Sequence, residues 1–257
     1  MLRKKPIIYA FALASLVSYA SAADKKAESA PIVTPLSETC LPTEGLYGRH
    51  LAIWNSHGMY YNQIEGKWRW QRARLLGTVE DLHTSDYVLS YLVPMLENAG
   101  AYVFLPRERD TNPIEFIIDN DTPENRLYRE SGLWEDGTGT GFAHLRERYE
   151  DGMNPFEEGT YRLATTVGGD ATASITWHIP VTADGRYAVY VSYKSMKNST
   201  TDARYTVHHA GGETLFSVNQ TMGGGTWIYL GTFEFAAGGD NRVVIDNHSG
   251  KAGRTIT

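Results

Sequence analysis

The stretch from His50 to Asp110 organises the first half of the chain. It opens with the short apolar run Leu51-Ala52-Ile53-Trp54, and a second run, Ala101-Tyr102-Val103-Phe104-Leu105, lies near its end. Between these runs, apolar residues recur at helical spacing: Leu82, Leu89, Leu92, Val93, Leu96 and Ala99. A helix that leads from one apolar strand to another predicts a βαβ unit with two parallel strands.

Both ends of this helix carry recognisable signals. Thr78, with Asp81 three residues later, resembles a capping box and predicts the start of the helix. Gly100 follows the last apolar position and predicts its end.

Polar residues with possible metal chemistry lie beside the predicted strands. His57 follows the first strand and Glu80 lies near the helix start, so we expect an imidazole and a carboxylate to meet at one rim of the sheet. The alternatives are a hydrogen-bonded loop histidine and a carboxylate favoured by the helix dipole. His83 could share a helix face with Glu80 as a further ligand, and Arg107 with Asp110 is expected to form a structural ion pair.

The N-terminus has the pattern of a secretory signal peptide over residues 1–22. Basic residues precede an apolar run from Ile7 to Val17, and Ala20-Ser21-Ala22 is a small-residue cleavage site. Removing this segment leaves 21 positive and 30 negative side chains, a net charge of −9. The charge argues against a nucleic-acid partner, and we expect a secreted, periplasmic or extracellular protein without a stable membrane anchor. Cys40 is the single cysteine, which excludes an internal disulfide framework.

The remaining chain divides into segments with different sequence patterns. Residues 23–45 are expected to be a flexible linker, and residues 111–158 a connector with a short helix near Phe142–Tyr149. From Gly159 to Thr257, period-2 patterns predict an antiparallel, jelly-roll-like β-sandwich. Its expected strands are 160–166, 172–179, 185–194, 203–209, 213–219, 226–235 and 241–248. Because Arg254–Thr257 begins another strand pattern, we expect the chain to be a fragment of a longer protein.

Aromatic residues in the sandwich are candidates for stacking on sugar rings. These are Trp177, Tyr193, Tyr205 and Trp227. The competing interpretation is core packing, because a sandwich of this size must bury most of its aromatic side chains.

The first block resembles two families. Residues 56–62, 68–72, 78–82, 92–101 and 106–110 are similar to secreted bacterial proteins of the golvesin and xanthan lyase type. The His57-Gly58 pair, the later Glu80, the leucine-rich helix and the spacing of Gly100, Val103, Arg107 and Asp110 also resemble zinc-dependent N-acetylmuramoyl-L-alanine amidases. That resemblance implies zinc ligation by His57 and Glu80. A later His ligand and a catalytic Glu have no match in this chain, and the catalytic residues therefore stay unassigned.

The second block resembles the golvesin or Xly carbohydrate-binding-like domain. The matching residues are 202–209, 211–212, 218–220, 223–227 and 230–233. Together the resemblances imply a secreted protein acting on peptidoglycan or another polysaccharide, with an amidase-like α/β part at residues 46–110 and an inserted β-sandwich. A non-catalytic binding or adhesion module and a polysaccharide lyase are the alternatives.

Overall fold

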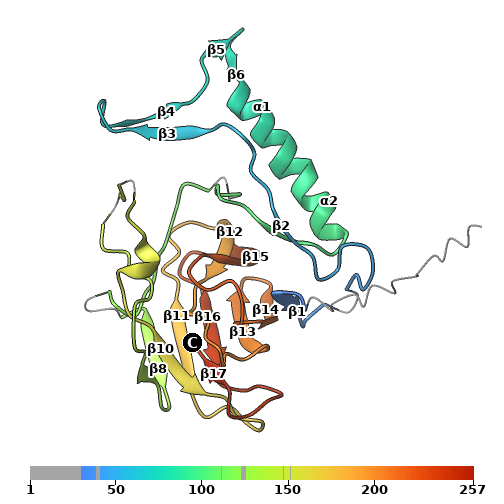
Figure 1. Cartoon of the computed structure of the whole chain (residues 1–257), viewed down its shortest axis with the longest axis vertical. Coiled ribbons are helices and arrows are strands. Elements are labelled where there is room, and N and C mark those ends of the chain that lie inside the picture. The colour runs from blue at the N-terminus through green and yellow to red at the C-terminus, as the bar shows by residue number, and fades with distance from the viewer. Residues whose placement is uncertain (1–29, 39–40, 111, 123–125, 147, 151) are drawn as a thin grey trace, which may run out of the picture.

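The computed structural model describes residues 30–38, 41–110, 112–122, 126–146, 148–150 and 152–257. The predicted signal peptide and Cys40 lie outside these residues. The described chain is mostly β-structure, and its helices form one continuous rod (Figure 1). Within the described residues, no helix combines the length and apolar character needed to cross a bilayer.

Most strands belong to one antiparallel unit, here called the β-domain. Its largest sheet has the order β1-β14-β13-β16-β11-β8. The strands of this sheet are β1 (Val33–Pro35), β8 (Tyr128–Ser131), β11 (Ser174–His178), β13 (Ala203–His209), β14 (Gly212–Val218) and β16 (Arg242–Asp246). A second sheet pairs β12 (Gly185–Val191) with β15 (Ile228–Phe235). A third joins β9 (Glu135–Asp136), β10 (Arg162–Thr165) and β17 (Thr255–Ile256), and a short 3₁₀ turn, η2 (Pro155–Glu157), precedes β10.

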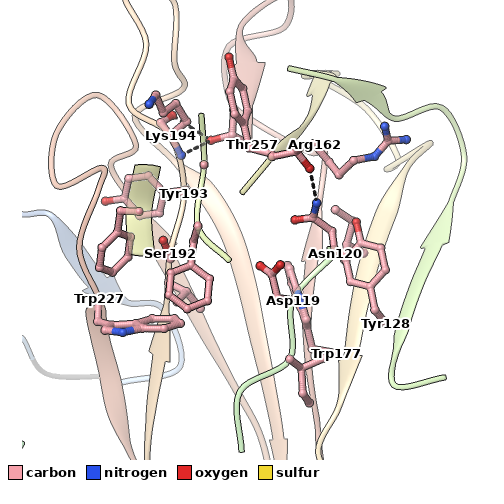
Figure 2. A pocket seen from close by; sticks show the side chains of 18 of the residues that line it. Asp119, Asn120, Tyr128, Arg162, Trp177, Ser192, Tyr193, Lys194, Trp227 and Thr257 are labelled. Atoms are coloured by element: carbon pink, nitrogen blue, oxygen red, sulfur yellow. Dashed lines mark hydrogen bonds between the residues drawn. The ribbon is translucent and has the colours of Figure 1, made fainter. Parts of the chain in front are cut away.

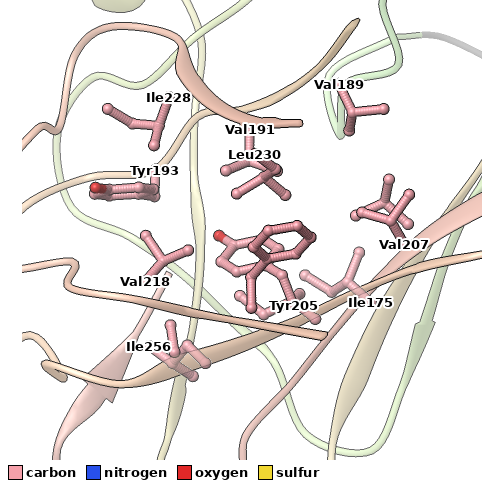
Figure 3. Close-up of a cluster of buried hydrophobic side chains, with 14 of the residues drawn as sticks. Ile175, Val189, Val191, Tyr193, Tyr205, Val207, Val218, Ile228, Leu230 and Ile256 are labelled. Atoms are coloured by element: carbon pink, nitrogen blue, oxygen red, sulfur yellow. The ribbon is translucent and has the colours of Figure 1, made fainter. Parts of the chain in front are cut away.

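The sheets enclose one hydrophobic core (Figure 3). Alternate residues of β13, Ala203, Tyr205 and Val207, are buried. Tyr187, Val189 and Val191 of β12 are buried in the same cluster. Period-2 burial on strands of two sheets is the pattern of two layers packed face to face. All seven strands expected after residue 159 are present, within a few residues of their predicted bounds.

A β-bulge changes which side chains of β15 face the core. Val189 pairs with Gly231 and Tyr190 pairs with Tyr229, so Leu230 is an extra residue in β15. An inserted residue exchanges the two faces of a strand. A constant period of two would place Tyr229 and Phe235 on one face, whereas across the bulge Phe235 packs in the core with Leu230. Tyr229 instead carries hydrogen-bonding and cation–π partners from residues 102 and 109.

Residues 46–110 form the α/β unit. Its strands β2 (His50–Ala52) and β7 (Tyr102–Phe104) pair in parallel, which confirms the predicted βαβ connection. The helical rod between them consists of α1 (Glu80–Tyr87), the π-helical turn η1 (Val88–Leu92) and α2 (Val93–Asn98). Two hairpins precede it: β3 (Met59–Asn62) with β4 (Lys67–Trp70), and β5 (Arg74–Leu75) with β6 (Thr78–Val79).

The buried line of the helix differs from the predicted one. Val93 is buried and Leu96 packs against the same cluster, as predicted, but Leu82 and Leu92 are exposed and Asp81 is buried. A π-helical turn adds one residue to the helix and rotates everything beyond it, so a constant 3.6-residue period predicts the wrong side chains on one side of the turn. The predicted capping box is also wrong, because Thr78 lies in β6 and the N-cap residue Val79 makes no side-chain cap.

Two segments expected to be irregular belong to the β-domain. Within the predicted linker, β1 pairs with β14, and Ile32 is buried in the core. Within the predicted connector, β8 pairs with β11, and Trp134 is buried in the same core. The described residues between 142 and 149 form no helix. The α/β unit therefore lies between β1 and β8 of the β-domain in sequence, with β1 beside β14 in space (Figure 1).

Candidate functional site

A small pocket opens in the β-domain beside Trp227 and is called the Trp227 pocket (Figure 2). Its volume is about 130 Å³, and Trp177, Tyr128, Phe142 and Phe156 also line it. The Trp227 indole packs edge-on against Phe142, with ring centroids 4.7 Å apart. Trp227 remains 37% exposed, so the pocket combines a fixed aromatic wall with an accessible indole.

The polar side of this pocket is formed by a loop at residues 118–122. The Asp119 carboxylate lies in the pocket, and burial raises its pKa to about 6. Its Oδ1 accepts a hydrogen bond from the backbone N–H of Asp121 at 2.9 Å. Asn120 donates through Nδ2 to the Thr160 hydroxyl at 2.8 Å. These amide and carboxylate groups, facing an indole, could bind the hydroxyls of a ligand whose ring packs on Trp227.

Two cationic side chains border the pocket, and both are already engaged. The Arg162 guanidinium forms ion pairs with Glu130 at 2.7 Å and with Asp136. Lys194 donates through Nζ to the backbone oxygen of Thr140 at 2.7 Å. Because both cations already have partners in the protein, the pocket is not mainly a binding site for acidic groups.

The predicted sugar-stacking residues divide into two groups. Trp177 and Trp227 line the pocket. Tyr193 also borders it but is buried, and its hydroxyl donates to the Met222 oxygen at 2.8 Å. Tyr205 is 1% exposed and its hydroxyl accepts from Gln220 at 3.1 Å. Its assignment to sugar stacking is corrected, because no ring face of Tyr205 is open to a ligand.

A larger hollow, here called the cleft, lies between the α/β unit and the β-domain. Its volume is about 810 Å³, within the ~300–1,000 Å³ typical of ligand sites. The α/β unit contributes Trp54 and Arg107, and the β-domain contributes Tyr190 and Tyr229. Trp177 and Trp227 line both the cleft and the Trp227 pocket, so the two hollows adjoin.

Direct contacts hold the two walls of the cleft together. Tyr102 donates to the Tyr229 backbone oxygen at 3.1 Å, and the Arg109 guanidinium lies 3.8 Å from the Tyr229 ring centroid. Asp110 accepts from the Ala188 backbone N–H at 2.8 Å, and Tyr190 donates to Glu108 at 2.5 Å.

His57 and Glu80 lie close together in the α/β unit, as their positions in the sequence predict. His57 Nδ1 lies 3.6 Å from a Glu80 carboxylate oxygen. The Arg72 guanidinium contacts the same imidazole, with Nε 3.1 Å from Nδ1 and Nη2 2.6 Å from Nε2. Arg72 also lies 3.8 Å from Glu80.

This cluster fits a zinc ion only in part. The His57–Glu80 separation suits two ligands of one ion, but Arg72 places a positive charge against both imidazole nitrogens. Asp81, which follows Glu80 in α1, is buried, and its Oδ1 has no hydrogen-bond partner within the described residues. Among the residues that the structure describes, no group of three or more His, Cys, Asp or Glu side chains could hold a metal ion. The His83 ring packs against Tyr87.

The predicted Arg107–Asp110 ion pair is wrong. Arg107 donates to the backbone oxygens of Ser56 and Met59 and to Gln71, which fixes the loop that carries His57. Asp110 accepts from Ala188 in the β-domain. The charged pair at this end of the unit is Arg109 with Glu97, 2.7 Å apart.

Several pocket residues carried no functional prediction. Asp119 and Asn120 belong to a stretch that the sequence marks only as loop-like, and Phe142 and Phe156 lie in the predicted connector. The sequence signal that could have indicated Asp119 and Asn120 is the polar run Asp119-Asn120-Asp121, which shortly precedes an aromatic-rich domain.

Comparisons with known proteins assign the second half of the chain. Residues 148–257 match the Golvesin C-terminal domain. The chain is 37% identical over 79 residues to a xanthan lyase of Bacillus sp. (strain GL1), a match that covers 31% of this chain and 8% of that protein. A solved xanthan lyase of Paenibacillus is 26% identical, with a TM-score of 0.41, over 51% of this chain and 11% of that one.

The C-terminal part is thus a golvesin- and Xly-like domain. The chain spans about a tenth or less of the length of the xanthan lyases it matches.

Proposed function

We propose that this chain is an exported polysaccharide-binding protein whose β-domain holds the sugar. The observation that carries the proposal is the Trp227 pocket, in which an accessible indole from the golvesin-like region lines the same hollow as the Asp119 carboxylate and the Asn120 amide, which precede that region. The sequence similarity to a xanthan lyase supports a polysaccharide as the ligand.

The chemistry of the pocket suits a pyranose ring. One face of such a ring is apolar and packs on an indole, while its hydroxyls need hydrogen-bond acceptors and donors around the edge. Trp227 is held by Phe142 and Phe156, so little side-chain entropy is lost when a ring binds against it. Among the residues that line the pocket, Asp119 supplies an acceptor and Lys194 a donor.

Affinity electrophoresis of the full chain in gels containing xanthan, or pull-down on purified peptidoglycan, tests the proposal. We expect retention on one of these polysaccharides. Trp227→Ala should weaken binding about tenfold or more, since a buried aromatic anchor commonly contributes over 1.4 kcal/mol. Trp227→Phe should keep part of the affinity.

Trp68→Ala is the matched control. Trp68 is an exposed tryptophan on β4 that lines neither hollow, and its loss should leave retention unchanged. Equal retention of the Trp227→Ala variant and the native chain would remove the pocket from the proposal.

A second candidate function is zinc-dependent amide hydrolysis of peptidoglycan, favoured by the 3.6 Å approach of His57 and Glu80. Zinc in such enzymes activates a water molecule and polarises the carbonyl. In this chain His57 and Glu80 would hold the ion, Gln71 and Arg107 would fix the His57 loop, and Arg72 would have to move away from the imidazole.

Calorimetric titration with zinc separates this candidate from polysaccharide binding. With only two ligands we expect weak binding, abolished by His57→Ala or Glu80→Ala, and no release of peptides from cell walls. Nanomolar zinc affinity of the 257-residue chain would show that another side chain completes the site.

Export is tested separately. Mass spectrometry of secreted protein should find an N-terminus near Ala23, as the cleavage pattern predicts. An intact Met1 in the secreted fraction would contradict this.

A further inference from the structure

The cleft continues the Trp227 pocket into the α/β unit. Three aromatic residues, Trp177, Tyr190 and Trp227, line both hollows, so the two hollows adjoin along these side chains. The Trp227 pocket alone, at about 130 Å³, is small, whereas the cleft adds about 810 Å³ on its other side. The large space next to a ligand seated on Trp227 is therefore the cleft.

The α/β unit offers an aromatic surface of its own in this hollow. Trp54 follows β2, lines the cleft and is 68% exposed, far more than a tryptophan buried for stability. Figure 1 shows β2 on the side of the unit that faces the β-domain. Trp54 and Trp227 thus belong to opposite walls, one supplied by each half of the chain.

Most charged side chains that line the cleft already have an ion-pair or hydrogen-bond partner in the protein. Arg109 pairs with Glu97, Glu108 accepts from Tyr190, and Asp110 accepts from the Ala188 N–H. What remains for a ligand is a set of aromatic faces with polar edges. That combination suits consecutive sugar rings better than a charged peptide or a phosphate.

The two walls are also fixed before any ligand binds. The Tyr102–Tyr229 hydrogen bond joins β7 to β15, and the Arg109–Tyr229 cation–π contact joins the segment after β7 to the same strand. A preformed cleft does not lose binding energy to domain closure.

We propose that the cleft and the Trp227 pocket form one extended site that binds several consecutive sugars of a linear polysaccharide, with Trp54 stacking on a sugar remote from the one on Trp227. The proposal rests on the polysaccharide-binding function and adds that the α/β unit is part of the binding site. It therefore predicts that affinity depends on the length of the sugar chain.

The test is calorimetry of the full chain with fragments of graded length from whichever polysaccharide, xanthan or peptidoglycan glycan, retains the protein. We expect the dissociation constant to fall at least about tenfold from the shortest binding fragment to the long ones, and then to level off. Trp54→Ala should remove that gain while leaving the shortest fragment's affinity unchanged, whereas Trp227→Ala should weaken binding of every fragment.

Tyr91→Ala is the control, because Tyr91 is 60% exposed on the helix and lines neither hollow. A dissociation constant independent of length, or an unchanged length dependence in Trp54→Ala, would overturn the extended site. The polysaccharide-binding function would still stand if Trp227→Ala weakened binding in the same experiment. Failure of every fragment to bind would remove both proposals.

Discussion

The β-domain and the α/β unit bury very different amounts of apolar surface. Within the described residues, the β-domain cluster contains 21 buried apolar side chains, whereas the cluster in the α/β unit consists of Val93, Ala101 and Val103. Conversely, the unit exposes large apolar residues along its helix and hairpins, including Tyr87, Tyr91, Met95, Trp68 and Leu76.

This difference indicates that the stability of the α/β unit depends on its contacts with the β-domain. Tyr102 and Phe104 of β7 pack against the β-domain core, so part of the unit's burial is supplied by the other region. A small apolar cluster gives little stability of its own, because the entropy of ordering the chain consumes most of the gain. We expect the β-domain to set the global stability and the unit to open locally.

The largest test of this comparison is truncation in the two cores. Tyr205→Ala should lower the free energy of unfolding by about 3–5 kcal/mol, since it removes a fully buried aromatic ring. The matched change in the unit, Val93→Ala, should leave the main urea transition in place and increase hydrogen exchange in β7. A global shift from Val93→Ala as large as that from Tyr205→Ala would show that the two regions unfold together.

The next test concerns the strand that precedes the α/β unit. Ile32→Ala should cost about 2–4 kcal/mol in urea unfolding, because Ile32 is buried in the β-domain core. Leu36→Ala is the control, since Leu36 is 51% exposed just beyond β1, and it should change stability by less than about 0.5 kcal/mol. If the two variants behave alike, β1 adds nothing to the core.

The pH dependence of the β-domain gives a third test. Burial raises the pKa of Asp119 from 3.8 to about 6, so the fold favours the protonated carboxyl. Its contribution is complete below pH 3.8 and is lost as the pH rises through about 6. Asp119→Asn should therefore be more stable than the native chain at pH 7, by at most about 3 kcal/mol, and about equal to it near pH 3.5.

Chemical denaturation at the two pH values checks this prediction. In the Asp119→Asn variant the side-chain amide oxygen can still accept from the Asp121 N–H, so the loop keeps its hydrogen bond. A stability difference that does not change with pH would contradict the assigned pKa.

The smallest expected effect concerns the contact between the α/β unit and the β-domain. Arg109→Met removes the Glu97 ion pair and the cation–π contact with Tyr229, and should cost about 1–2 kcal/mol of local stability. Hydrogen exchange of the β7 amides should rise while the global transition stays fixed. Arg186→Met, in an exposed pair with Glu234, should change neither measurement.

Local periodicity was sufficient to predict the strands and the parallel βαβ connection. It could not locate the two places where one extra residue shifts the pattern, the π-helical turn at Val88–Leu92 and the bulge at Leu230. Both depend on packing against residues distant in sequence. The pairing of β1 with β14 was missed for the same reason, since a three-residue strand carries no periodicity.

The candidate site residues were likewise predicted only in part from the sequence. Composition and strand pattern selected Trp177 and Trp227, and the resemblance to amidases selected His57 with Glu80. Asp119 was not predicted because a loop carboxylate becomes unusual only when the fold buries it. Trp54 was not predicted because its exposure in the cleft depends on how the two regions dock.

The pairing of β1 with β14 also determines when the large sheet can be completed during folding. The Leu215 backbone N–H donates to the Ser37 hydroxyl across 178 residues of chain. At a synthesis rate of roughly 5–20 residues per second, β1 leaves the ribosome on the order of ten to thirty seconds before its partner exists. Until then Ile32 and its strand have no sheet to join, so closing the large sheet is a late step that must draw together the most distant parts of the chain.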